Sequence, residues 1–228
     1  MDFENRIVVV TGGTGALGRA VVAKLLDAGA RLRIPYIVDA EAQAFPANER
    51  VNLVRCDLTS ETDVARLYEG LDSLWASIHI AGGFTFAPIA QSGKAVLMRM
   101  LDMNLVSAYL CSRAAIQCFG SGEGRIVNVA SRQALEPRLG AGMTAYTAAK
   151  AAVAALTQAL AAEVKGNRIL VNAVAPSIID TPANRADMPK ADFSQWPKPE
   201  EIAATIVFLA SPGNRLTSGA VVPIYGAA

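Results

Sequence analysis

The feature that most constrains the fold is a regular alternation of short β-branched runs with longer segments whose apolar residues recur at helical spacing. The short runs predict strands at residues 7–10, 31–38, 51–55, 77–81, 125–130, 168–174 and 220–225. The longer segments predict helices at residues 16–28, 61–68, 93–119, 146–164 and 199–210. Such alternation is typical of an α/β protein with a doubly wound parallel sheet and helices on both faces.

The whole chain, residues 1–228, is expected to form a single domain. Since 52% of its residues are hydrophobic and 18% are charged, it can bury a large core. The strand and helix pattern breaks between residues 176 and 199, where five prolines occur without clear periodicity. We interpret residues 177–199 as a lid or binding loop within the domain.

Charge and cysteine content exclude several classes of function. The 21 basic and 20 acidic residues nearly cancel and form no basic stripe, so we expect no nucleic-acid partner. The apolar run at residues 7–10 is too short for a signal peptide or a membrane span, so we expect a cytoplasmic protein with no membrane partner. Cys56, Cys111 and Cys118 form no CxxC pair, which favours buried thiols over a disulfide framework or a metal site.

A glycine-rich turn, TGGTGALG at residues 11–18, joins the first strand to the first helix. Glycines let the backbone approach a pyrophosphate, and the helix N-terminus offers free N–H groups and a positive dipole end. This context predicts a Rossmann-type dinucleotide site. No Gly-Lys-Ser/Thr sequence closes the turn, so a P-loop kinase or ATPase is excluded. The candidate contacts are Gly12, Thr14, Gly15, Leu17 and Gly18.

The end of the second strand does not determine whether the cofactor is NAD or NADP, which carries a further phosphate on the adenosine ribose. A carboxylate usually stands there to bind the ribose, but Tyr36 occupies the place in this chain. Asp39 could reach the ribose hydroxyls and Arg33 could accompany a 2′-phosphate, but we favour a solvated surface charge as the account of each. We therefore expect NAD or NADP as the cofactor, without a preference.

Three segments together resemble the short-chain dehydrogenase/reductase family. They are the turn at residues 11–18, the YTAAK sequence at residues 146–150 and the NAVAP sequence at residues 172–176. The likeness extends over nearly the whole chain. It implies a single-domain Rossmann fold and an oxidoreductase that moves a hydride between a nicotinamide and a small carbonyl or alcohol.

The resemblance also implies four catalytic residues, Asn104, Ser131, Tyr146 and Lys150. Tyr146 and Lys150 stand at i and i+4 of one helix, where an ammonium group favours the phenolate that serves as general acid and base. Ser131 is expected to hydrogen-bond the substrate oxygen. Asn104 resembles the residue that holds a proton-relay water beside Lys150. Structural alternatives are a strand-end cap for Ser131 and a satisfied polar helix residue for Asn104.

Further cofactor contacts follow from the same resemblance. Tyr146 and Lys150 are expected to contact the cofactor as well as the substrate. The other implied contacts are Asp57 and Leu58 for the adenine, Ala81, Gly82 and Gly83 for the ribose, and Pro176, Ile179 and Thr181 for the nicotinamide. Asp57 has the alternative of capping the helix after Thr59.

The chain departs from the family pattern at several positions. Gly15 carries the middle glycine, a spacing more familiar among family members that act on nucleotide sugars. His79 replaces a structural asparagine, and we interpret it as a substitute for that residue's hydrogen bond. The segment between Ser131 and Tyr146 is about two residues longer than expected, which leaves the substrate open.

Two alternatives to the dehydrogenase remain at this point. One is a cofactor-binding sensor or scaffold without turnover, and the other is a nucleotide-sugar epimerase or dehydratase. We also expect a homo-oligomer, a tetramer or a dimer, because the helix at residues 146–164 carries alanines at positions 148, 151, 152, 155, 159 and 162 that form a small-residue surface.

Overall fold

The computed structural model describes residues 2–119 and 122–227, whose strands form one seven-stranded parallel sheet with the order β3-β2-β1-β4-β5-β6-β7. From β1 the chain winds outward to β2 and β3, returns to β4 beside β1, and then winds outward on the other side. The order therefore reverses between β1 and β4, which is where open α/β sheets bind ligands. The strands are β1 Ile7–Thr11, β2 Arg31–Tyr36, β3 Val51–Arg55, β4 Leu74–His79, β5 Glu123–Val129, β6 Arg168–Pro176 and β7 Val221–Ile224.

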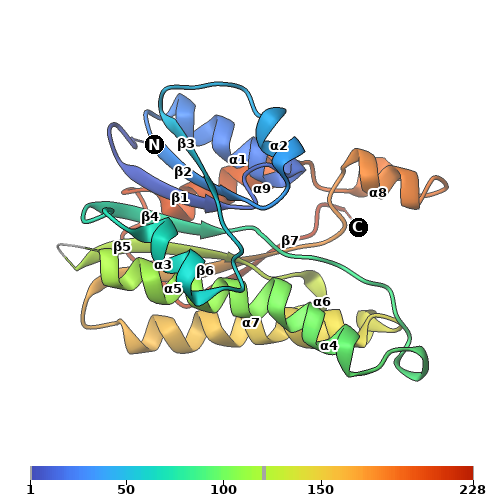
Figure 1. Cartoon of the computed structure of the whole chain (residues 1–228). Helices are drawn as coiled ribbons and strands as arrows, with labels where there is room; N and C mark the ends of the chain where they lie inside the picture. Colours follow the sequence, from blue (N-terminus) through green and yellow to red (C-terminus); the bar gives the residue numbers. More distant parts are fainter. Residues whose placement is uncertain (1, 120–121, 228) are drawn as a thin grey trace.

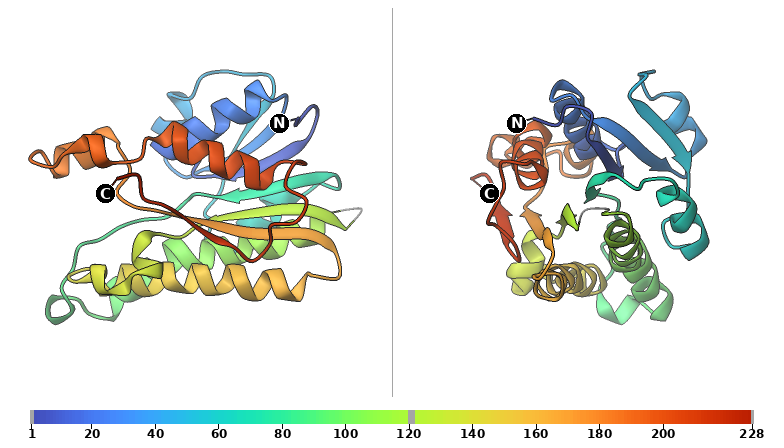
Figure 2. Two further views of the ribbon diagram at one scale, coloured as in Figure 1. Left: turned by 180° about the vertical axis from the view of Figure 1, so that it is seen from behind. Right: turned by 90° about the vertical axis from the view of Figure 1, so that its left-hand side faces the viewer.

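Helices cover both faces of this sheet (Figures 1 and 2). Helices α1, Ala16–Asp27, and α9, Pro199–Ala210, pack together on one face. The other face is covered by α3, Glu61–Tyr68, by α5, Ser107–Cys118, and by α7, Thr144–Glu163. The predicted Rossmann-type fold is confirmed.

The two larger hydrophobic cores of the described residues lie on the two faces of the sheet, and β1 contributes to both. Val8 and Val10 pack in the core with α1 and α9, whereas Val9 packs in the core with α3 and α5. All three valines are fully buried. Since both faces of a central parallel strand are buried, its sequence is a continuous apolar run rather than an alternating one.

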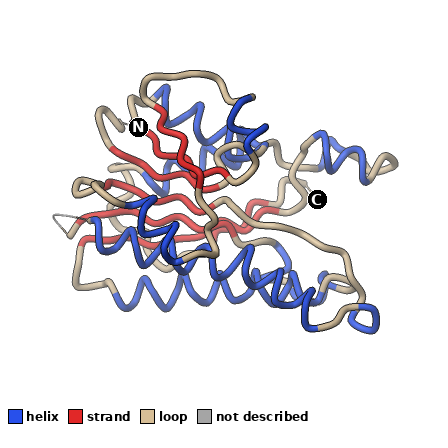
Figure 3. The backbone as a smooth tube through the Cα atoms, viewed as in Figure 1, coloured by secondary structure: helices blue, strands red, loops and turns tan. Residues whose placement is uncertain are grey.

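Short elements gather at the carboxyl ends of the strands. Figures 1 and 3 show α8 and the long loop between β4 and α4 extending at this end of the molecule. The site is therefore surrounded by irregular segments held on a rigid sheet. These elements are α2 Asp39–Gln43, α4 Lys94–Leu101, α6 Arg132–Leu135, α8 Pro182–Asp187, and the 3-10 turns Ile89–Gln91, Pro137–Gly140 and Phe193–Gln195.

Several element boundaries differ from the predictions. β2 ends at Tyr36 because Val38 is the N-cap of the unexpected helix α2. β4 begins at Leu74, since residues 74–76 are buried like the rest of the strand, and it ends at His79. The predicted helix at residues 93–119 is divided into α4, a π-helical turn at Asp102–Val106, and α5. The segment interpreted as a lid contains the short helix α8.

Candidate active site

Helix α7 carries Tyr146 and Lys150 on the side that faces the sheet. Lys150 is buried, and its Nζ donates a hydrogen bond of 2.8 Å to the backbone carbonyl of Val129, the last residue of β5. Burial lowers the pKa of Lys150 to about 8. The lysine is therefore fixed at the carboxyl end of a central strand.

Asn104 lies in the π-helical turn between α4 and α5 and is almost fully buried. Its amide group donates to the carbonyls of Gly83, at 3.0 Å, and Met100, at 2.9 Å, and its oxygen accepts from the Gly83 N–H at 3.2 Å. The widened turn thus aims this side chain at the loop that follows β4. Such π turns are frequent at functional sites.

Gly82 lies between Asn104 and Lys150. A Cβ atom at this position would stand 2.5 Å from Asn104 Oδ1 and 3.4 Å from Lys150 Nζ. Only a glycine fits here without displacing Asn104, so the structure brings these two predicted residues together around one exposed strip of backbone.

Ser131 and Tyr146 form the other half of the group. Burial raises the pKa of the Tyr146 phenol, and the nearby Ser131 hydroxyl partly offsets this by lowering it. The Ser131 Oγ is buried, yet within residues 2–119 and 122–227 it has no partner at standard hydrogen-bond geometry, so we attribute its effect on the phenol to proximity. The phenol pKa is therefore raised by burial, whereas the sequence predicted that Lys150 would lower it.

The glycine-rich turn between β1 and α1 is closely packed. Gly12 has a φ of 66°, and a Cβ atom there would lie 2.7 Å from the Ala81 nitrogen. A Cβ atom at Gly18 would lie 2.0 Å from the Gly12 carbonyl oxygen. Leu17 is buried, whereas Gly15 is exposed at the N-cap of α1. This cradle of bare backbone at a helix N-terminus fits a pyrophosphate.

The other predicted cofactor residues lie at the same edge of the sheet. Asp57 and Leu58 follow β3, and the Asp57 carboxylate accepts from the backbone and the hydroxyl of Thr59 at 2.9 and 2.7 Å. The cap of α3 is Ser60, so Asp57 stabilises the turn before the helix rather than capping it. Ala81 donates its N–H to Thr11 Oγ1 at 3.2 Å.

Pro176, Ile179 and Thr181 lie where β6 leads into α8. Pro176 is the last residue of β6. The carbonyl of Ile179 accepts from the Asn184 side chain at 2.8 Å, and Thr181 caps α8 by accepting from the Asn184 backbone at 3.2 Å. Asn184 therefore sets the conformation of the segment that is expected to contact the nicotinamide.

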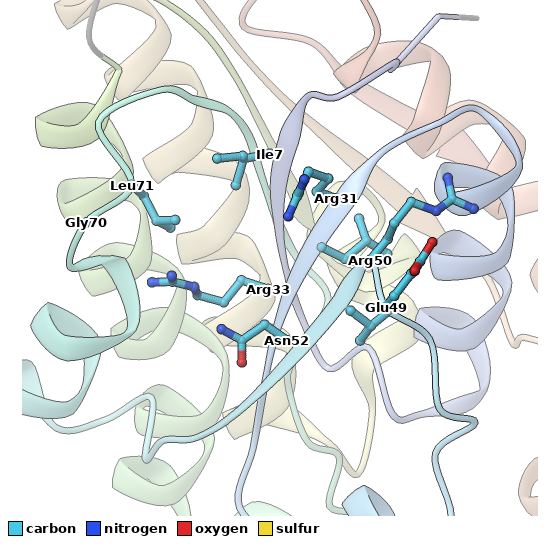
Figure 4. A pocket seen from close by; sticks show the side chains of 10 residues that line it. Ile7, Arg31, Arg33, Glu49, Arg50, Asn52, Gly70 and Leu71 are labelled. Carbon is cyan, nitrogen blue, oxygen red and sulfur yellow. The ribbon is translucent and has the colours of Figure 1, made fainter.

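The two charged candidates near the second strand are both engaged elsewhere. Arg33 donates to the carbonyls of Leu67 and Glu69, each at 2.9 Å, on the α3 side of β2. Figure 4 shows it pointing into a hollow of about 230 Å³ that is also lined by Arg31 and Arg50. Asp39 forms an exposed ion pair with Arg55, in which Asp39 Oδ1 lies 3.4 Å from Arg55 Nε. Arg33 therefore does not stand beside the adenosine ribose.

Phe84 is a residue of the site that the sequence analysis missed. Its ring meets that of Tyr146 edge-on, with 5.1 Å between the centroids, and 57% of the residue is exposed. No motif marks this position, because it lies in an irregular loop without periodicity. The exposed ring forms an apolar surface directly beside the phenol.

Two other kinds of feature are absent from the described residues. In the described part of the chain, no group of three or more His, Cys, Asp or Glu side chains could hold a metal ion. Among those same residues, we find no helix with the length and apolarity needed to cross a membrane. Cys56 and Cys111 are buried thiols, as predicted, whereas Cys118 is a half-buried thiol.

The parallel sheet with a glycine-rich turn at its switch point is that of a dinucleotide-binding α/β protein. The sequence matches the short chain dehydrogenase family over residues 6–192. It is 34% identical to cis-4-hydroxycyclohexanecarboxylate dehydrogenase of Sinomonas cyclohexanicum, covering 98% of this chain and 96% of that protein. It is also 34% identical to galactitol 2-dehydrogenase of Rhizobium johnstonii, covering 97% and 94%. The chain therefore belongs to the short-chain dehydrogenase/reductase family.

Solved structures agree with this assignment. A short-chain dehydrogenase/reductase of Brucella melitensis, a glucose/ribitol dehydrogenase, has a TM-score of 0.86 at 28% identity and covers 100% of this chain and 98% of its own. ElxO with NADP bound shares the fold, with a TM-score of 0.90 at 23% identity over 97% and 98% of the two chains. This chain is accordingly an oxidoreductase of a family that uses NAD or NADP.

Proposed function

We propose that this chain transfers a hydride between NAD(P) and a small carbonyl or alcohol, with Tyr146 as general acid and base. The observation that carries the proposal is the grouping of Asn104 and Lys150 around Gly82, beside the buried Ser131 hydroxyl and Tyr146. The bound nicotinamide supplies the hydride. The Tyr146 phenol gives its proton to the substrate oxygen in reduction and takes it back in oxidation.

Lys150 and Ser131 assist this proton transfer. With a pKa of about 8, Lys150 is mainly charged at neutral pH, so its ammonium stabilises a phenolate one helix turn away and can hydrogen-bond the nicotinamide ribose. The Ser131 hydroxyl, which lacks a partner of standard geometry within the described residues, is free to donate to the substrate oxygen as charge develops there. Asn104 holds the loop at Gly83 in place.

The cofactor would lie along the carboxyl edge of the sheet. The pyrophosphate would be held by Gly12, Thr14, Gly15, Leu17 and Gly18, and the adenine by Asp57 and Leu58. The ribose would be held by Ala81, Gly82 and Gly83, and the nicotinamide by Pro176, Ile179 and Thr181. The close packing at Gly12 and Gly18 supports the first of these placements. Residues 177–199 would form the lid. One hydrogen bond supports this, since the Asp180 N–H donates to the Pro197 carbonyl at 3.0 Å and so ties the two ends of the segment together.

The substrate is proposed to be a small, largely apolar alcohol or ketone. Phe84 supports this choice because its exposed ring lies directly against Tyr146. A relative at 34% identity is named for a hydroxycyclohexane carboxylate, which is a cyclic secondary alcohol. Cyclic alcohols and their ketones are therefore the first compounds to test.

The decisive experiment is turnover with purified protein. Alcohol and carbonyl panels would be incubated with NAD, NADP, NADH or NADPH, and the absorbance of the reduced nicotinamide would be followed. We expect a net change with at least one cyclic compound. Isomerisation of a nucleotide sugar without any net change would contradict the proposal in favour of an epimerase. Tight cofactor binding without turnover in any panel would contradict it in favour of a sensor.

We further propose a homo-oligomer, a tetramer or a dimer, that works in the cytoplasm, where NAD and NADP are available. The alanines at positions 148, 151, 152, 155, 159 and 162 of α7 are exposed or half-buried, while Lys150, Val153 and Thr157 face the sheet. A helix face of small residues supports close packing against a second helix of the same kind.

A further inference from the structure

A chain of buried polar side chains runs across the sheet from α3 to α7. Each of its five members is at most 3% exposed. The chain joins two helices through the neighbouring strands β4 and β5. Its contacts are Tyr68 OH to Ser77 Oγ at 2.6 Å, Ser77 Oγ to His79 Nε2 at 2.8 Å, His79 Nδ1 to Asn128 Oδ1 at 2.8 Å, Asn128 Nδ2 to Thr157 Oγ1 at 2.9 Å, and Thr157 Oγ1 to the Val153 carbonyl at 2.8 Å.

The direction of the chain follows from its α7 end. Thr157 uses its hydroxyl hydrogen on the Val153 carbonyl, one turn earlier in the helix. Its oxygen therefore accepts from Asn128, which places the Asn128 NH₂ group toward α7 and the Asn128 oxygen toward His79. His79 must then carry its hydrogen on Nδ1.

The other end of the chain completes the arrangement. With its hydrogen on Nδ1, a neutral His79 has a lone pair on Nε2, which accepts from Ser77. Ser77 Oγ in turn accepts from the Tyr68 hydroxyl. A charged imidazole would place a second N–H against Ser77, so the Ser77 hydrogen would have to turn to the Tyr68 oxygen and the Tyr68 hydrogen would have to leave Ser77. The neutral tautomer with its hydrogen on Nδ1 therefore satisfies every group along the five side chains without reversing any contact.

One of these contacts and a second hydrogen bond beside it attach the catalytic helix to β5. Asn128 holds Thr157, and the next residue, Val129, accepts from Lys150. Lys150 and Thr157 are two turns apart on the same face of α7, so the helix is fixed at two points along its length. A displacement of α7 along its axis would break both contacts.

We propose that His79 and Asn128 are positioning residues, and that the chain they complete holds α7 where Lys150 meets Val129 and Tyr146 meets Ser131. The proposal rests on the proposed function for these catalytic residues. The hydrogen positions along the chain, however, can be measured without any turnover.

The surroundings of His79 keep it neutral. Burial lowers the pKa of His79 to about 4, partly opposed by its hydrogen bond to Asn128. Tyr68, at the α3 end, and Cys111, which contacts Tyr68 from α5, are neutral as well, because burial raises the pKa of both. Within residues 2–119 and 122–227, the side chains that hydrogen-bond His79 are the neutral Ser77 and Asn128.

Nitrogen NMR tests the tautomer directly, because His79 is the only histidine of the chain. With ¹⁵N-labelled full-length protein, we expect a hydrogen on Nδ1, an accepting Nε2, and unchanged signals between pH 8 and pH 5. A hydrogen on Nε2, or protonation with a midpoint near the ordinary pKa of about 6.5, would overturn the hydrogen-bond directions assigned from Tyr68 to Thr157.

Turnover separates positioning from simple stability. Thr157→Val keeps the shape of the side chain and removes the acceptor for Asn128, so we expect kcat to fall about tenfold while the substrate KM and the cofactor Kd stay within about twofold. The matched control is Ile126→Val. Ile126 is buried like Thr157, but it lies in β5 and takes no part in the hydrogen-bonded series of side chains. A kcat loss no larger than that of Ile126→Val would overturn the positioning role.

Conservative replacement gives a second test. His79→Asn keeps a donor and an acceptor, so it should retain clearly more kcat than His79→Leu, which leaves Ser77 and Asn128 unpaired. Equal losses in both variants would contradict the proposal. If His79→Leu does not fold, the Thr157→Val comparison decides. A wild-type protein without any turnover would overturn the proposed function and the positioning role together. The NMR experiment would still decide the hydrogen-bond directions from Tyr68 to Thr157.

Discussion

Lys150 Nζ donates a hydrogen bond of 2.8 Å to the Val129 carbonyl, one helix turn after Tyr146 on the same face of α7. Within residues 2–119 and 122–227, no carboxylate forms an ion pair with this buried lysine. A backbone carbonyl therefore fixes the position of the ammonium group, and no ion pair within the described residues neutralises its charge. We expect this charge to stabilise the Tyr146 phenolate once the proton has left and to bind ribose hydroxyls.

Replacement of Tyr146 tests the proton transfer. Tyr146→Phe keeps the ring that packs against Phe84 and removes the hydroxyl, so we expect kcat to fall by about a hundred- to ten-thousandfold. Cofactor Kd, measured by titration calorimetry, should change little. The matched control is Tyr109→Phe, at an exposed position of α5. Activity that survives in Tyr146→Phe would show that another group transfers the proton.

Gly82 tests the cradle between Asn104 and Lys150. Gly82→Ala would place a Cβ atom 2.5 Å from Asn104 Oδ1, and overpacking of this kind costs about 1–3 kcal/mol. We expect weaker cofactor binding and lower kcat, measured by calorimetry and by turnover. Gly93→Ala is the matched control, because nothing lies within 4 Å of a Cβ atom there. Equal behaviour of the two variants would mean that the cofactor does not approach Gly82.

Periodicity and turn chemistry were sufficient to predict the sheet. Each predicted strand overlaps a strand of the structure, and the clearest prediction is β1, whose burial on both faces makes it continuously apolar. The short helices α2 and α8 could not be predicted in this way. They lie at the surface, where α2 buries none of its residues, so no apolar stripe marks them.

The candidate site was predictable only where a motif fixes the residue. Tyr146, Lys150 and Gly18 belong to recognisable patterns and lie at the expected edge of the sheet. Arg33 and Phe84 were not predictable, since their roles depend on tertiary contacts: Arg33 turns toward the end of α3, and Phe84 turns toward Tyr146. The π turn at Asn104 likewise has no sequence signature.

Phe84 tests the substrate pocket. Phe84→Ala removes the ring beside Tyr146, so we expect the KM for a cyclic substrate to rise about tenfold, consistent with losing about 1–2 kcal/mol of apolar contact. The cofactor Kd should not change. Phe208→Ala removes a similarly exposed ring from α9, on the other face of the sheet, and should leave the KM unaltered. A KM unchanged in Phe84→Ala would place the substrate elsewhere.

The exposed alanine face of α7 tests the oligomer. Ala155→Arg puts a long charged side chain on this face, so we expect the wild-type oligomer to dissociate toward a monomer in light scattering at micromolar concentration. The control is Ala44→Arg, at an exposed position after α2, which should keep the wild-type mass. A monomeric wild-type protein would contradict the proposed assembly outright.

Acid stability tests the neutral state of His79. Burial lowers its pKa to about 4 in the folded protein, whereas the unfolded chain has the ordinary value of about 6.5, so between these values the unfolded state binds more protons. Stability contributed by His79 is therefore fully present above pH 6.5 and is lost as the pH falls toward 4, by roughly 3 kcal/mol in total. Urea unfolding at a series of pH values measures the slope. His79→Asn lacks the titrating group, so the difference between the two curves isolates its contribution from that of the carboxylates. Parallel curves between pH 4 and 6.5 would show that His79 has the same pKa in both states, contrary to a buried, neutral imidazole.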